Sequence, residues 1–91
     1  MSYWTDVKGV IRGTIKNKAS VVTILEEVFI GYDLGDPYIS YYKPSDSVNI
    51  GFVFDSSDSE AIKKIEQFTN KLKQHKLTYD LSVTTRFHNW F

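Results

Sequence analysis

Apolar residues recur at every second position in three segments of this chain and at every third or fourth position in two others. The order of these segments is the strongest constraint on the fold. In residues 48–55 the even positions hold Val48, Ile50, Phe52 and Phe54, and they alternate with Asn49, Gly51, Val53 and Asp55. Such alternation predicts a strand with one buried face. Similar patterns predict strands over residues 3–15 and 77–87, and turn residues on both sides mark residues 38–43 as a short strand.

Two segments have helical spacing. The stronger begins with Ser57 and Glu60, a capping box in which each side chain accepts the other residue's backbone N–H. Its expected buried positions are spaced by four, three and four residues: Ala61, Ile65, Phe68 and Leu72. The other segment, residues 20–30, has Ser20 as an N-cap and Gly31 as a stop. Its β-branched residues at 21–24 would also suit a strand.

These segments give the order βαββαβ over one domain, residues 1–91. That order predicts an α+β, ferredoxin-like fold, in which two helices cover one face of a four-stranded antiparallel sheet. The chain has no cysteine, which excludes disulfides and thiolate metal sites. With no apolar leader or membrane-length segment, the expected location is the cytoplasm.

Acidic and basic side chains balance, 11 against 11, but they are segregated along the sequence. The zero net charge argues against direct nucleic-acid binding. Residues 19–60 have eight acidic side chains against Lys43 alone, a balance of −7. The fold is expected to gather an acidic pole from Asp6, Glu26, Glu27, Asp33, Asp36, Asp55, Asp58 and Glu60. Such a pole would steer the domain to a basic surface on a host protein. The alternative is that these charges only complement helix dipoles.

Aromatic residues stand at both ends of the chain, where antiparallel terminal strands would bring them together: Tyr3, Trp4, Phe87, Trp90 and Phe91. Exposed at the acidic pole, they would anchor a protein partner. Alternatively they form a small cluster that pins the termini. The predicted partner-binding residues are therefore Tyr3, Trp4, Asp6, Glu26, Glu27, Asp33, Asp36, Asp55, Asp58, Trp90 and Phe91.

No catalytic motif is present, so we expect neither an enzyme nor a cofactor. His75 and His88 lack metal-ligand spacing. The acidic pairs Asp33/Asp36 and Asp55/Asp58 could hold Mg²⁺, but they adjoin turns and a helix cap, where solvation is the expected state. On the sheet's uncovered face, the two central strands are expected to lack the aromatic residues on which RNA bases stack.

The opening Thr5-x-Val7-x-Gly9-x-Ile11-Arg12 resembles small phage and prophage proteins. The resemblance implies an inhibitor of bacterial defence systems, of the anti-CRISPR kind. On this basis the leading hypothesis is a non-catalytic inhibitor that docks its acidic pole on a host nucleic-acid-handling protein. The alternative is a regulatory module of the same fold that senses a small ligand or dimerises through a sheet edge or open face. Either a monomer or a homodimer is compatible with the sequence.

Overall fold

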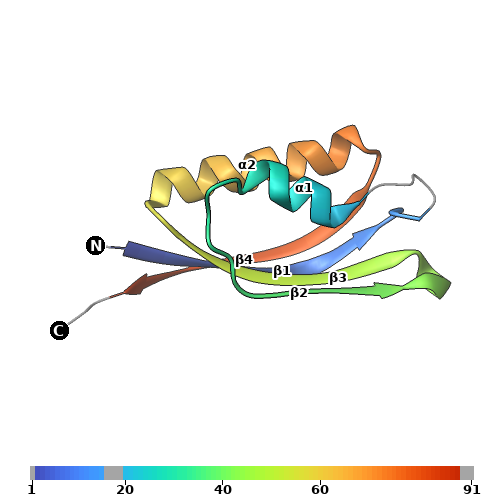
Figure 1. Ribbon diagram of the computed structural model, residues 1–91, viewed down its shortest axis with the longest axis horizontal. Coiled ribbons are helices and arrows are strands. Elements are labelled where there is room, and N and C mark those ends of the chain that lie inside the picture. The colour runs from blue at the N-terminus through green and yellow to red at the C-terminus, as the bar shows by residue number, and fades with distance from the viewer. Residues whose placement is uncertain (1, 16–19, 89–91) are drawn as a thin grey trace.

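The computed structural model describes residues 2–15 and 20–88 and has the expected element order. Its elements are β1 (Ser2–Arg12), α1 (Val21–Val28), β2 (Gly35–Tyr42), a short 3-10 turn (Lys43–Ser45), β3 (Ser47–Ser56), α2 (Asp58–Gln74) and β4 (Thr78–His88). The strands form one antiparallel sheet in the order β2-β3-β1-β4. Both helices lie on one face of that sheet (Figure 1). The predicted ferredoxin-like fold is confirmed.

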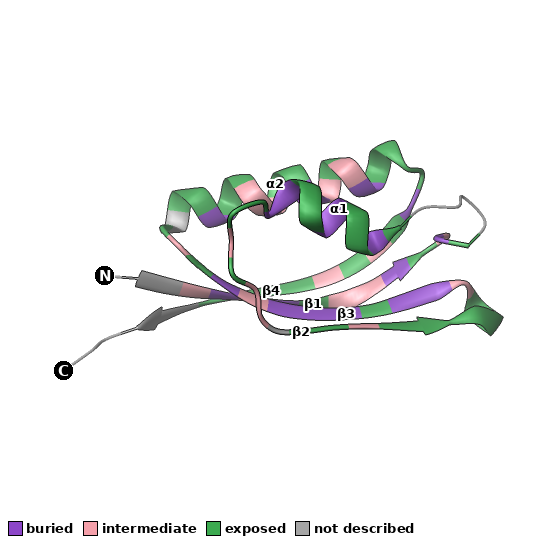
Figure 2. Cartoon of the chain, viewed as in Figure 1, coloured by how far each residue is buried: buried purple, intermediate pink, exposed green. Residues whose placement is uncertain are grey.

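The core lies between the helices and the two central strands, β1 and β3. Val7 of β1 lies opposite Phe52 of β3 on one side and Val83 of β4 on the other. Successive side chains of a strand point to opposite faces, so the odd positions of β1 and the even positions of β3 face the helices. Buried residues follow these positions, whereas β2 is mostly exposed (Figure 2). The other face of the sheet, which no described helix covers, is called the open face below.

Strand β1 ends at Arg12, three residues earlier than the alternation predicts. Gly13 has a φ of 94°, a left-handed conformation that turns the chain out of the strand. Asp46 stabilises the turn that follows the strand. Its backbone carbonyl accepts a hydrogen bond from the Gly13 N–H at 2.9 Å, and its carboxylate accepts one from the Ile15 N–H at 2.7 Å. Ile15 is consequently 51% exposed instead of buried.

Both helices begin at the predicted serine caps. The Ser20 hydroxyl accepts from the Thr23 N–H, and the Ser57 hydroxyl accepts from the Glu60 N–H, each at 3.3 Å. The Glu60 carboxylate accepts a hydrogen bond from the Tyr32 hydroxyl, which ties the start of α2 to the segment after α1. Neither described helix is both long enough and apolar enough to cross a membrane.

Candidate functional site

Two of the acidic residues predicted to bind a partner lie near lysines in the structure. Glu27 makes an ion pair with Lys71 of α2 at 3.3 Å. Asp6 lies part-way along β1, between Val53 and Thr84 of the neighbouring strands, and its carboxylate is 3.9 Å from the Lys8 ammonium. Both carboxylates are therefore near a lysine, which reduces the one-signed field expected at the acidic pole.

The remaining predicted residues are spread over several elements. Asp33 lies in the exposed segment between α1 and β2, and Asp55 lies near the end of β3, also exposed. Asp36 is in β2, and Asp58 is the first residue of α2. Tyr3 of β1 is paired with Ser56 and Phe87. Glu26 borders a hollow described below, and Trp90 and Phe91 lie outside the described residues. Docking of a host protein on this set stays a prediction.

The open face of the sheet has aromatic side chains on β1 and β2. Trp4 is on the same side of β1 as Asp6, and an added Cβ at Gly35 would lie 4.0 Å from its indole ring. Tyr38 covers Gly51, where an added Cβ would collide with the tyrosine ring. Tyr42 is on the same side of its strand as Tyr38 and is 57% exposed. The expectation for the two central strands missed Trp4, and strand 38–43, which contains the tyrosines, had been given no face.

Strand β2 lies at one edge of the sheet. Among the described strands, it pairs with β3. Tyr38, Ser40 and Tyr42 point to the open face, and Ile39 and Tyr41 point to the helix face. Tyr38 and Tyr41 are each 50% exposed. Exposed strand edges offer backbone N–H and C=O groups to another strand, and proteins usually protect them with charged residues. The segment from Tyr38 to Tyr42 has no charged residue.

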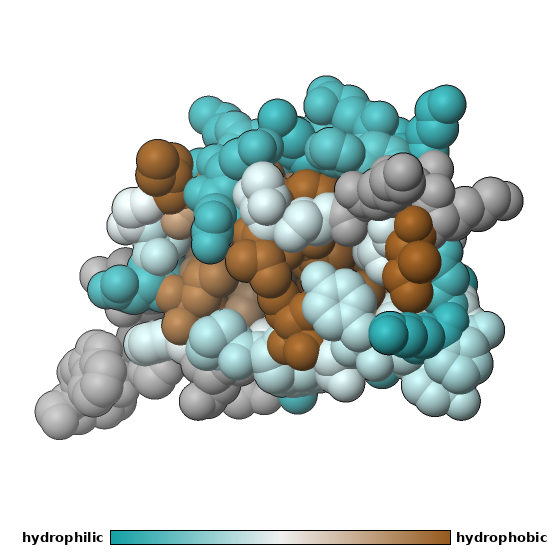
Figure 3. Space-filling model, turned by 45° about the vertical axis from the view of Figure 1, so that its right-hand side comes forward, coloured by the Kyte–Doolittle hydropathy of each residue, from teal (hydrophilic) through white to brown (hydrophobic). Residues whose placement is uncertain are grey.

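A hollow of about 250 Å³ lies between α1 and β2, and is called the α1–β2 hollow. It is lined by Val22, Leu25, Glu26, Phe29, Tyr32, Leu34, Pro37 and Ile39. In Figure 3 an apolar area lies below the hydrophilic outer surface of the helices. The hollow adjoins the β2 edge through Pro37 and Ile39, so the exposed strand edge and the apolar surface are continuous.

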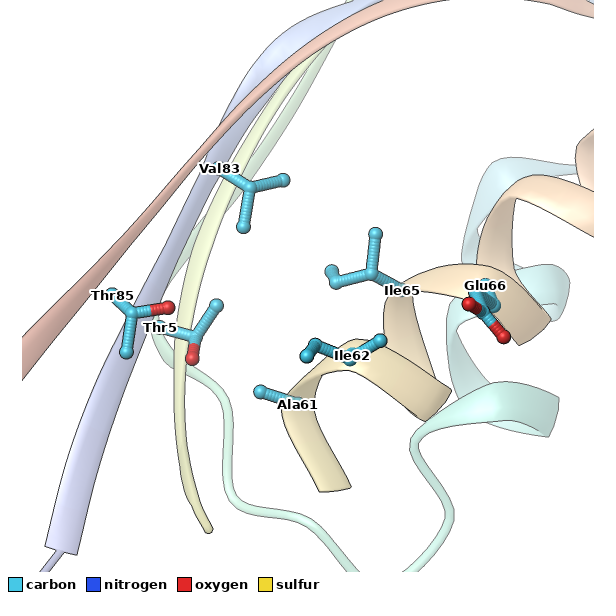
Figure 4. Close-up of a pocket in the computed structure, with 7 residues that line it drawn as sticks. All are labelled: Thr5, Ala61, Ile62, Ile65, Glu66, Val83 and Thr85. Atoms are coloured by element: carbon cyan, nitrogen blue, oxygen red, sulfur yellow. The ribbon is translucent and has the colours of Figure 1, made fainter. Parts of the chain in front are cut away.

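A second hollow lies at the other side of the molecule, between the first turns of α2 and strands β1 and β4. This α2–β4 groove measures about 200 Å³ and is lined by Thr5, Ala61, Ile62, Ile65, Glu66, Val83 and Thr85. Figure 4 shows Thr5, Val83 and Thr85 projecting from the sheet toward Ala61, Ile62 and Ile65 of the helix. Ile62 and Val83 are 56% and 43% exposed, so the groove opens to the surface.

The residue sizes along one row of the sheet explain why this groove exists. Thr5 of β1 pairs with Phe54 of β3 on one side and with Thr85 of β4 on the other. Phe54 is completely buried and fills the space below the helices. The two threonines are too small to fill the equivalent space below α2. No group of three or more histidine, cysteine or acidic residues that could hold a metal ion occurs in the described ranges.

No protein-family model and no curated protein matches the sequence. Solved structures match the fold. An uncharacterized protein from Thermotoga maritima is 15% identical, with a TM-score of 0.57 over 93% of this chain and 95% of that one. A putative glycine cleavage system transcriptional repressor is 18% identical, with a TM-score of 0.55 over 100% of this chain and 51% of that one.

A third structure with the same arrangement is the regulatory subunit of aspartate kinase from Thermus thermophilus. It is 15% identical, with a TM-score of 0.50 over 91% of this chain and 50% of that one. The chain therefore spans about half the length of this subunit and of the putative repressor. At these identities the similarity shows the fold alone.

Proposed function

We propose that this chain is a non-catalytic regulatory module that works as a homodimer joined through the β2 edge. The observation that carries the proposal is the exposed, uncharged segment from Tyr38 to Tyr42 at an edge of the sheet. Two copies related by a two-fold axis would pair these strands antiparallel and extend the sheet across both copies. The similarity to a putative transcriptional repressor and to a regulatory subunit supports a regulatory role.

The side chains of β2 match their own two-fold copies when the axis passes through Ser40. In that register Ser40 faces Ser40, Tyr38 faces Tyr42, and Ile39 faces Tyr41 of the second copy. Each pair lies on a single face of the sheet, as direct cross-strand neighbours must. Aromatic pairs and aromatic–β-branched pairs are among the more favourable cross-strand contacts, each contributing about 0.2–1 kcal/mol. Small serines at the centre allow the two backbones to approach without steric conflict.

The surface beside the strand supports the same arrangement. Ile39 and Tyr41 lie on the helix face, where the α1–β2 hollow leaves Val22 43% exposed. In the dimer the hollows of both copies would adjoin the new strand pair, which would remove apolar surface from water. Because the chain has zero net charge, overall repulsion does not oppose this association.

A charge placed at the symmetry axis tests the proposal. Ser40 is exposed in the single chain, so Ser40→Lys should fold normally, yet it would place two ammonium groups directly opposite each other in the dimer. Sedimentation equilibrium should give twice the 10.5 kDa chain mass for the wild type and the single mass for the variant. Thr84→Lys, an exposed change on the open face of β4, is the matched control and should stay dimeric.

A complementary pair of variants identifies the register. Ser40→Asp alone should also be monomeric, but an equimolar mixture with Ser40→Lys should regain the dimer mass, because opposite charges would then meet at the axis. A wild type that stays at the single mass at high concentration contradicts the proposal. If Thr84→Lys were monomeric and Ser40→Lys dimeric, the interface would lie at the β4 edge, which would also contradict the proposal.

A further inference from the structure

The α2–β4 groove contains a polar group whose burial needs an explanation. Thr5 is completely buried, and its hydroxyl has no hydrogen-bond partner among the described residues. A buried hydroxyl without a partner costs about 1–3 kcal/mol. Valine has nearly the same shape and would fill the position without that cost. Packing alone would therefore favour valine over threonine at position 5. The threonine lies in the wall of the groove.

The chemistry of the walls limits what could occupy the groove. Ala61, Ile62, Ile65 and Val83 supply branched or small aliphatic surface, which suits a short aliphatic group. Thr5 and its cross-strand neighbour Thr85 supply hydroxyls that can donate or accept a hydrogen bond. The described lining has no lysine or arginine, and its one ionisable residue, Glu66, would repel an anion.

We propose that the α2–β4 groove binds a small, uncharged aliphatic molecule whose hydroxyl, carbonyl or amide group hydrogen-bonds to Thr5. The aliphatic part contacts Ile62, Ile65 and Val83, which are otherwise left in contact with water. The polar part hydrogen-bonds to the Thr5 hydroxyl, which is closed to solvent in the ligand-free structure and reaches the groove when the side chain changes its χ1 rotamer. This site does not depend on the β2-edge dimer, since it is formed by α2, β1 and β4 of a single chain.

Three isosteric probes test the class of ligand: isovaleramide, isovalerate and isoamylamine. They share a branched four-carbon unit and differ in the charge of the polar end. Titration of the isotope-labelled protein, followed by NMR shifts of the Ile62, Ile65 and Val83 methyl groups, should show saturable binding of the amide in the millimolar range. Isovalerate should bind at least about tenfold more weakly, since it brings a carboxylate near Glu66.

A pair of threonine variants tests the role of the buried hydroxyl. Thr5→Val should weaken isovaleramide binding about fivefold, the loss of one hydrogen bond, while the protein becomes no less stable to urea. Thr14→Val is the matched control, because the Thr14 hydroxyl is also buried without a partner among the described residues but lies outside the groove. It should leave the affinity unchanged.

Each other outcome overturns part of the proposal. Absence of saturable shifts with all three probes would remove the site. Isovalerate or isoamylamine binding as tightly as the amide would contradict an uncharged ligand. Equal amide affinity in Thr5→Val and the wild type would show that the hydroxyl does not contact the ligand. The same titrations with monomeric Ser40→Lys separate a failure of this site from a failure of the dimer.

Discussion

Single residues decide how closely the strands of this sheet approach one another, and Gly9 is the clearest case. Its close neighbour is strand β4: an added Cβ would lie 2.2 Å from the Asp80 carbonyl oxygen and 2.7 Å from the Leu81 Cδ2. Leu81 thus occupies the space that a side chain at position 9 would need.

Gly9→Ala should therefore destabilise the protein by about 2–3 kcal/mol, because backbone of β4 would have to move to admit the methyl group. Gly35→Ala is the matched control, since its Cβ would lie 3.6 Å from the nearest atom, an ordinary contact. That variant should stay within about 0.5 kcal/mol of the wild type. Urea unfolding at equal protein concentration measures both. Equal midpoints for the two variants would contradict the assigned approach of β4.

The residues that sequence reasoning missed share one property: they are small or uncharged residues that become notable only through their neighbours. Thr5 reads as an ordinary strand threonine until its row partners, Phe54 and Thr85, are known. The face of Tyr38 depends on the strand register, and residues 38–43 have no alternation from which to determine it. A face assignment for that short strand would have revealed the tyrosines of the open face.

At the scale of elements, Lys64 links α2 to the end of α1. The Lys64 ammonium of α2 donates to the Val28 carbonyl at 2.8 Å and lies 5.1 Å from the centre of the Tyr32 ring. Val28 is the last residue of α1, where carbonyls lack helical partners. A cation there also complements the helix dipole, a role that no basic residue of the helix itself fills.

Lys64→Met keeps the aliphatic stem and removes the charge, so it should cost about 1–2 kcal/mol of stability through the lost hydrogen bond. Amide hydrogen exchange should quicken in the last turn of α1 more than in α2. Lys63→Met removes an exposed lysine from the same helix turn and should change stability by less than about 0.5 kcal/mol. If both variants were equally stable, Lys64 would have no capping role.

The sequence predicted the elements well because local signals agreed with the final packing. Alternation over residues 48–55 marks a central strand, and spacing from Ala61 to Leu72 marks the buried side of α2. It could not predict ion pairs between distant side chains. Glu27 pairs with Lys71 across a helix–helix contact that only the tertiary structure specifies. Long side chains reach such partners independently of sequence distance.

At the scale of the whole molecule, the two proposed sites lie at opposite edges of one sheet. The β2 edge and Thr5 of the α2–β4 groove are separated by β3. Ser40 lies in the same row of the sheet as Asn49 and Val10. Thr5 is five residues from Val10 along β1, about 17 Å, which is beyond the range at which the energetic effects of substitutions usually depend on one another. Phe54 lies beside Thr5 on β3 and has no exposed surface. Close packing of this kind leaves one arrangement of the core and not two.

Ligand binding and dimerisation should therefore be independent. The dissociation constant of isovaleramide in Ser40→Lys should agree with that of the wild type within about twofold, and Thr5→Val should leave the dimer mass unchanged. The double variant should be monomeric, like Ser40→Lys, and should bind isovaleramide with the reduced affinity of Thr5→Val, because independent effects add. NMR titration and sedimentation equilibrium on the four proteins complete the cycle. A change in affinity of more than about fivefold on loss of the dimer would show coupling through the sheet, and by linkage the ligand would then shift the dimer equilibrium by the same factor.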